Sequence, residues 1–134
     1  MSRQARLQAV ASYDGKSPVI GEARQFTAAF LDRALARGVA VGAVRRGDAL
    51  LVVSELVTNA VRHAPGPCTL ALDLQDGRLE IAVSDTSARA LEPQPFEPRR
   101  IAQHGLEIVL ALCADLSTDV TDAGKIVRAH LPVV

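Results

Sequence analysis

The stretch Ser54–Pro65 reads SELVTNAVRHAP, and it combines a helical spacing of apolar residues with several polar side chains. It closes a predicted helix over about residues 43–64, because proline disfavours the helical conformation in the residue before it. At about 100° per residue, the aliphatic side chains gather on one face of this helix. The other face carries four polar residues: Glu55, Asn59, Arg62 and His63.

This polar stripe has two interpretations. The simpler one is a solvent-exposed face, on which Arg62 and His63 also suit the negative end of the helix dipole. Asn59 fits that interpretation least, because asparagine is a poor helix former and here lies well inside the helix, one turn from Glu55. Periodicity alone favours the solvent-exposed face. The choice between the two interpretations depends on which segments of the fold lie beside this face of the helix.

The rest of the chain predicts one domain of helices and strands. Residues 19–37 carry apolar side chains at helical spacing, and Gly38 can end that helix. Residues 105–114 predict a short apolar helix. Alternating apolar residues predict strands over residues 3–11, 68–74, 78–84, 116–120 and 125–133. We therefore expect residues 1–134 to form a single α/β domain. It would be a two-layer sandwich whose mixed, mostly antiparallel sheet is covered on one face by helices.

The composition sets limits on partners and location. Of the 134 residues, 49% are hydrophobic and 22% are charged, and the formal net charge is zero. That balance argues against general electrostatic binding to nucleic acid or anionic lipid. No apolar run approaches the length of a membrane span, so we expect a soluble cytoplasmic protein. Cys68 and Cys113 stand apart among apolar neighbours, which is typical of small buried hydrophobic residues.

Two further segments are expected to border the polar stripe. Asp85 ends the strand RLEIAVSD, and its carboxylate can accept a hydrogen bond from an amino group. A proline-containing loop follows, and long loops inside a compact domain are more often functional than accidental. His104 and Gly105 stand where this loop ends and a helix is expected to begin, and helix N-termini attract phosphate. Together with Asn59, whose amide oxygen suits Mg²⁺, these groups predict a nucleotide site.

These residues resemble a known family. SELVTNAVRHA is similar to the N-box of the GHKL (Bergerat-fold) ATPases, which include gyrase and the histidine kinases. IAVSDTS resembles the first glycine box at its aspartate, HGLEIV resembles the second, and GKIVRAHLP resembles the closing strand. The resemblance covers nearly the whole chain. It is strongest to the small stand-alone domains of the anti-sigma-factor serine-kinase type that are found in actinobacteria.

The resemblance implies a role for each matching residue. It implies that Glu55 is the catalytic base for the attacking hydroxyl, and that Asn59 ligates the Mg²⁺ that bridges the phosphates. It also implies that Asp85 accepts a hydrogen bond from the adenine amino group and that a lid over about residues 86–104 covers the ATP. The remaining implied nucleotide contacts are Arg62, His63, Ser87, His104, Gly105 and Leu106. The implied cofactors are therefore ATP and Mg²⁺.

The chain departs from the family pattern at its glycines. Members often have glycine at the two positions that are Ser87 and Arg89 here. The lid usually ends in a glycine that is matched by Gln103, and Ile126 stands where a threonine often lies beside the base. Glycine lets the backbone approach phosphate closely, so its loss predicts weaker or slower nucleotide capture.

Two functions remain as alternatives. The first is an ATP-binding serine/threonine protein kinase of the anti-sigma-factor type, which regulates transcription in a partner-switching pathway. Its implied partners are a sigma factor, an antagonist protein that carries the target serine and, in a homodimer, a second copy of the chain; direct binding to nucleic acid or membrane is not expected. The second is a non-catalytic or weakly ATP-binding interaction module with degenerate glycine boxes. Glu55 separates the two, because a pure binding module needs no base.

Overall fold

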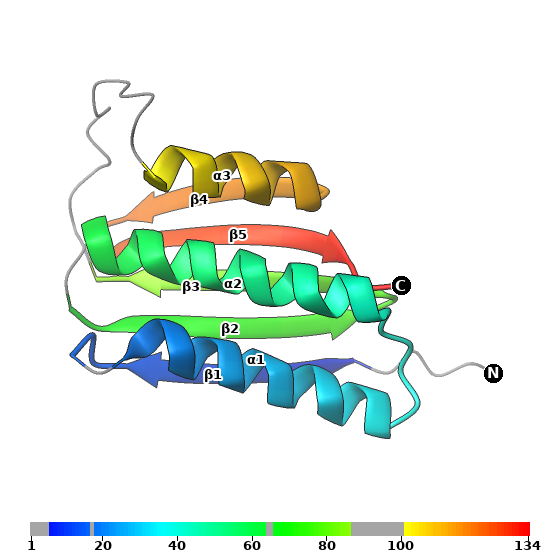
Figure 1. Ribbon diagram of the computed structural model, residues 1–134. Coiled ribbons are helices and arrows are strands. Elements are labelled where there is room, and N and C mark those ends of the chain that lie inside the picture. Colours follow the sequence, from blue (N-terminus) through cyan, green and yellow to red (C-terminus); the bar gives the residue numbers. More distant parts are fainter. Residues whose placement is uncertain (1–5, 17, 64–65, 87–100) are drawn as a thin grey trace.

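The computed structural model describes residues 6–16, 18–63, 66–86 and 101–134, with the backbone alone for residues 63 and 101–106. The elements follow one another in the order that periodicity predicts (Figure 1). They are β1 (Leu7–Tyr13), α1 (Val19–Ala36), α2 (Ala43–His63), β2 (Cys68–Gln75), β3 (Arg78–Asp85), α3 (Ile101–Leu112), β4 (Asp115–Thr121) and β5 (Gly124–Pro132). None of the described helices is long and apolar enough to cross a membrane.

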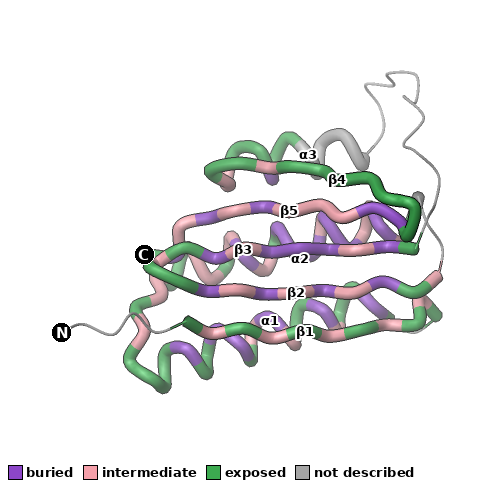
Figure 2. The backbone as a smooth tube through the Cα atoms, turned by 180° about the vertical axis from the view of Figure 1, so that it is seen from behind, coloured by how far each residue is buried: buried purple, intermediate pink, exposed green. Residues whose placement is uncertain are grey.

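The strands form one sheet in the order β1-β2-β3-β5-β4. Figure 1 shows the three helices on one face of this sheet, and Figure 2 shows the strands of the other face from behind. The two-layer α/β sandwich is therefore confirmed. Every described strand pair is antiparallel, so the sheet contains no parallel pair among the described residues. Because β5 lies between β3 and β4 and runs antiparallel to β3, the start of β5 at Lys125 lies beside Asp85.

The central strands form because their apolar residues alternate. In β2 the side chains at every second position, from Cys68 to Leu74, are buried, and those between them are partly exposed. The turn to β3 consists of Asp76 and Gly77, which have φ angles of 56° and 72°. Such left-handed pairs, favoured by Asp-Gly, match the twist of a two-residue hairpin and fix its register. The two strands predicted over residues 68–74 and 78–84 therefore pair as an antiparallel hairpin.

The helix α1 ends where glycine was expected to end it. Gly38 has a φ angle of 82°, a left-handed conformation that glycine adopts without steric cost. The N–H of Gly38 donates to the carbonyl of Leu35, and the N–H of Val39 donates to that of Ala34. These bonds satisfy carbonyl groups that the end of a helix otherwise leaves open.

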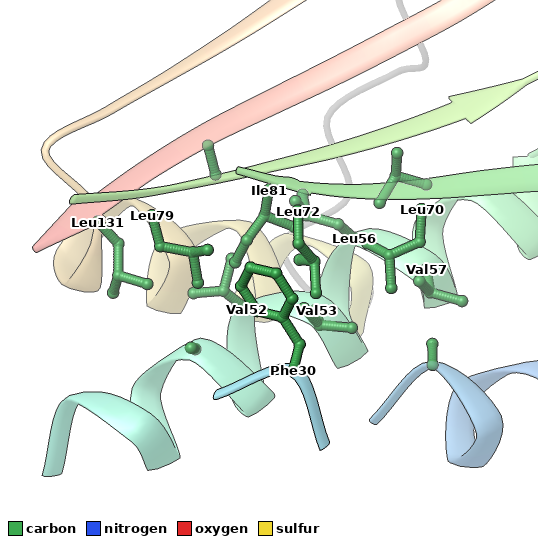
Figure 3. Close-up of a cluster of buried hydrophobic side chains, with 14 of the residues drawn as sticks. Phe30, Val52, Val53, Leu56, Val57, Leu70, Leu72, Leu79, Ile81 and Leu131 are labelled. Atoms are coloured by element: carbon green, nitrogen blue, oxygen red, sulfur yellow. The ribbon is translucent and has the colours of Figure 1, made fainter. Parts of the chain in front are cut away.

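The core lies between α2 and the middle of the sheet. Figure 3 shows side chains of α2, among them Val52 and Leu56, facing Leu72 and Ile81 of the strands. These four residues are at most 3% exposed. Because apolar burial is the main favourable term in folding, this layer fixes α2 over the sheet. The polar side chains of α2 are thereby held at a constant position relative to β3 and β5.

Two boundaries differ from those expected by more than two residues. The first strand lies at Leu7–Tyr13 rather than at residues 3–11, because its backbone pairs with β2 from Leu7↔Leu74 to Tyr13↔Cys68. The last helix begins at Ile101 rather than at Gly105. A glycine inside a helix costs only about 1 kcal/mol relative to alanine, so Gly105 does not prevent helix upstream of it.

Candidate functional site

The end of the domain that holds the C-terminus of α2 collects most of the predicted site residues. Figure 1 shows this end of α2 beside the end of β3 and the start of α3. Contacts of α2 with both α3 and β3 support the arrangement. The polar stripe therefore borders other elements of the fold, as the nucleotide interpretation requires.

Glu55 and Asn59 lie on α2 between its buried face and solvent. Both are half-buried, whereas Arg62, closer to the end of the helix, is exposed. Among the residues that the structure describes, neither Glu55 nor Asn59 has a hydrogen bond or ion pair through its side chain. The hydroxyls of Ser54 and Thr58 instead donate to carbonyls within the helix, at 2.9 and 2.6 Å. One carboxylate and one amide on this face thus have no side-chain partner within the described part of the chain.

Asp85 is the last residue of β3 and faces the helical layer. It alternates with the buried Val83 and Ile81, and its own side chain is 1% exposed. Opposite it in the sheet stands Lys125 of β5, whose Nζ lies 3.5 Å from Oδ2 of Asp85. The proposed acceptor for the base is therefore a buried carboxylate with an ammonium beside it.

Gly124 holds the backbone close to Asp85. Its φ angle is 142°, and a Cβ atom placed on it would lie 2.0 Å from the carbonyl oxygen of Asp85. Any side chain at this position would push β5 away from β3, because carbon and oxygen cannot approach so closely. This glycine therefore sets the spacing at which Lys125 meets Asp85.

The residues expected to bind phosphate are less accessible than the sequence predicted. Gly105 and Leu106 lie beyond the first turn of α3, which begins at Ile101. Only the first four N–H groups of a helix lack a partner within it, so the N–H groups of Gly105 and Leu106 belong to the helical ladder. For them to bind phosphate, the first turn of α3 must unwind.

Other predicted residues fall outside what the structure describes. The side chains of His63 and His104 are not described, and Ser87 lies in the segment 87–100, which is also undescribed. Most of the predicted lid lies in that segment, whereas its last four residues, 101–104, are helical. The roles of these residues stay predictions.

Comparison with known proteins shows which family this arrangement represents. The family model of the histidine kinase-like ATPase domain matches residues 20–131. The chain belongs to this family. The histidine kinase-like ATPase domain is an ATP-binding domain, and the predicted GHKL fold is thereby confirmed.

Solved structures agree with the assignment. The blue-light activated histidine kinase of Erythrobacter litoralis EL346 is similar at 27% identity with a TM-score of 0.55 over 71% of this chain. A structure of the histidine kinase domain of that protein is also 27% identical, with a TM-score of 0.50 over 66% of this chain. This ATPase domain spans 32% and 45% of those two chains. A comparison with curated proteins finds no match.

The residues present fit the nucleotide that the family binds. Asp85 supplies a carboxylate that can accept from an amino group, and Asn59 supplies an amide oxygen of the kind that Mg²⁺ accepts as ligand. Lys125 was not among the residues predicted for the site. The alternation Lys125, Val127, Ala129, Leu131 places the lysine on the inward face of its strand, and this signal was available in the sequence.

Proposed function

We propose that this ATPase domain binds Mg·ATP and transfers its terminal phosphoryl group to a serine or threonine of a protein partner. The observation that carries the proposal is the pair Glu55 and Asn59. They stand one turn apart on α2, both are half-buried, and neither has a partner among the described residues. A module that only holds nucleotide needs the amide but not the carboxylate.

The roles follow from the chemistry of phosphoryl transfer, which requires mainly positioning and charge neutralisation. Asp85 accepts from the amino group of the base and orients the nucleotide. Asn59 offers its amide oxygen to the metal. Mg²⁺, when bound, neutralises charge on the phosphates. Glu55 orients the attacking hydroxyl and takes its proton, because a carboxylate within hydrogen-bond reach is a competent base.

The biological setting that we propose is a partner switch. The domain phosphorylates a serine on an antagonist protein and sequesters a sigma factor when that antagonist is phosphorylated. The proposal is supported by the resemblance of the SELVTNAVRHA and HGLEIV segments to anti-sigma-factor serine kinases. Cytoplasmic location and pairing of two copies of the chain belong to the same proposal.

A second candidate is an interaction module without catalysis. The segment that follows Asp85, Thr86 to Arg89, contains no glycine, and Gly105 lies inside a helix rather than at its start. Both features disfavour close approach of the backbone to phosphate. In this case the fold would serve to contact a protein, with nucleotide bound weakly or not at all.

The deciding experiment combines binding and transfer. Calorimetric titration of Mg·ATP measures binding, and γ-labelled ATP with purified candidate antagonist proteins measures transfer. We expect binding by both the wild type and Glu55→Gln, and acid-stable phosphoserine with the wild type alone. Binding without transfer to any serine supports the interaction module. Acid-labile label on a histidine would instead indicate the activity that the names of the solved relatives carry.

A further inference from the structure

Lys125 is a charged side chain that the fold buries beside the proposed acceptor for the base. Its side chain is 8% exposed, and its Nζ lies 3.5 Å from Oδ2 of Asp85. The attraction within a buried ion pair often fails to offset the cost of desolvating both charges, so such a pair is weak evidence for stability. Stability alone therefore does not account for a lysine buried at this position, beside the proposed base acceptor.

The position of this pair is set by the backbone. Asp85 and Lys125 are directly opposite each other in neighbouring strands, and both face the helical layer. Gly124 keeps the two strands in close contact at this point. An ammonium carries three N–H donors, and the contact that Lys125 makes among the described residues is the ion pair with Oδ2 of Asp85. The pair therefore presents an acceptor and a donor side by side.

We propose that Lys125 is a specificity-determining residue that reads the base together with Asp85. This inference rests on the proposed binding of ATP. In adenine, the ring nitrogen N1 is an acceptor and lies directly beside the 6-amino group, which is a donor. Asp85 accepts from the amino group, while Lys125 donates to N1 and keeps its contact with Asp85. The second contact on the base strengthens binding in a chain whose phosphate-binding segments are poor in glycine.

The test removes each partner of the Lys125–N1 contact in turn. The ligands are Mg·ATP and Mg·1-deaza-ATP, in which a C–H group replaces N1, and binding is measured by calorimetry. We expect the wild type to bind ATP about tenfold more tightly than 1-deaza-ATP, the worth of one hydrogen bond to a charged group. In Lys125→Met the two ligands should bind equally, with the affinity for ATP about tenfold lower.

A matched control variant distinguishes the loss of a positive charge from the loss of the Lys125–N1 contact. Arg78 stands at the opposite end of β3 and pairs with Asp115 at 3.0 Å, so Arg78→Met also removes one cation and one ion pair. This variant should keep the tenfold preference for ATP. Lys125→Gln retains an uncharged N–H donor in case Lys125→Met does not fold. It should keep a preference for ATP of about two- to fivefold.

The outcomes separate the two levels of the proposal. If the wild type binds neither ligand, both ATP binding and the role of Lys125 are overturned. If the wild type binds ATP and 1-deaza-ATP equally, ATP binding stands and the role of Lys125 falls, whatever the variants do. A preference for ATP that persists in Lys125→Met, or tighter ATP binding by that variant, also overturns the role of Lys125.

Discussion

Nε2 of His130 lies 2.8 Å from Oε2 of Glu80, its direct neighbour on β3, on the sheet face opposite the helices. Nδ1 of the same ring contacts the carboxylate of Asp115 on β4, which also pairs with Arg78. Burial lowers the pKa of His130, but the hydrogen bonds to Asp115 and Glu80 outweigh it, so this pKa is raised above its ordinary value. The imidazolium thus joins three strands.

The raised pKa of His130 predicts how stability depends on pH. The folded state holds the proton more tightly than the unfolded chain, whose His pKa is about 6.5. The contribution of protonated His130 to the free energy of unfolding is therefore complete below about pH 6.5. It is lost as pH rises through the folded-state pKa of His130. Urea midpoints measured between pH 6 and 9 should fall with pH in the wild type and change less in His130→Gln. Equal slopes for the two proteins would show that His130 makes no such contribution.

Gly124 should tolerate no side chain. Gly124→Ala forces a Cβ onto the carbonyl of Asp85 at a φ angle of 142°, and we expect it to lower the free energy of unfolding by about 2 kcal/mol or more. Gly47 provides the control, because it lies within α2 and a Cβ there would meet no atom within 4 Å. Gly47→Ala should raise stability by about 0.5–1 kcal/mol. Chemical denaturation of both variants checks the contrast, and similar effects would contradict it.

Substitutions of Asn59 and Glu55 should affect Mg²⁺-dependent ATP binding and phosphoryl transfer differently. Asn59→Ala should abolish the part of ATP affinity that depends on Mg²⁺, because it removes the proposed oxygen ligand. Glu55→Gln should keep that part, because the amide has nearly the same size and the proposed role concerns the proton of the attacking group. Titrations with Mg²⁺ and with excess chelator measure the difference. If Asn59→Ala binds Mg·ATP as the wild type does, its role as metal ligand is wrong.

Leu72 should be among the costly positions of the core. It lies on β2 under α2 and is 1% exposed, so Leu72→Ala removes buried methyl groups and leaves a cavity (Figure 3). We expect a loss of about 2–5 kcal/mol in the free energy of unfolding. Val10, on the opposite face of the sheet, is 65% exposed, and Val10→Ala should change stability by less than about 0.5 kcal/mol. Comparable losses for the two would mean that the open face is covered in solution.

Much of the fold could be predicted because its signals are local. The two-residue alternation of β2 and β3 and the Asp76–Gly77 turn depend on neighbours in the chain, and the structure confirms them. Gly38 ended its helix as expected, for the same reason. The start of α3 was placed too late because Gly105 was interpreted as a boundary, whereas glycine lowers helix stability without forbidding helix.

The site was harder to predict, since it depends on pairing between distant segments. The sequence indicated Asp85 as the end of a strand, but which strand lies beside it depends on sheet order, which local patterns do not specify. Alternation along β5 indicated that Lys125 faces inward, but its position beside Asp85 depends on that sheet order. Half-burial of Glu55 and Asn59 likewise depends on how closely α2 approaches its neighbours, which periodicity on a single helix does not determine.

The insertion of β5 between β3 and β4 has a consequence for the time course of synthesis. Until β5 has left the ribosome, β3 is an edge strand with open backbone groups, and the carboxylate of Asp85 has no lysine beside it. At about 5–20 residues per second, the ribosome needs several seconds to pass from β3 to β5. A nascent chain therefore carries the carboxylate of Asp85 before it carries the ammonium group of Lys125. Under the proposed role of Lys125, the pair that reads the base is complete only once the β4–β5 hairpin has been made.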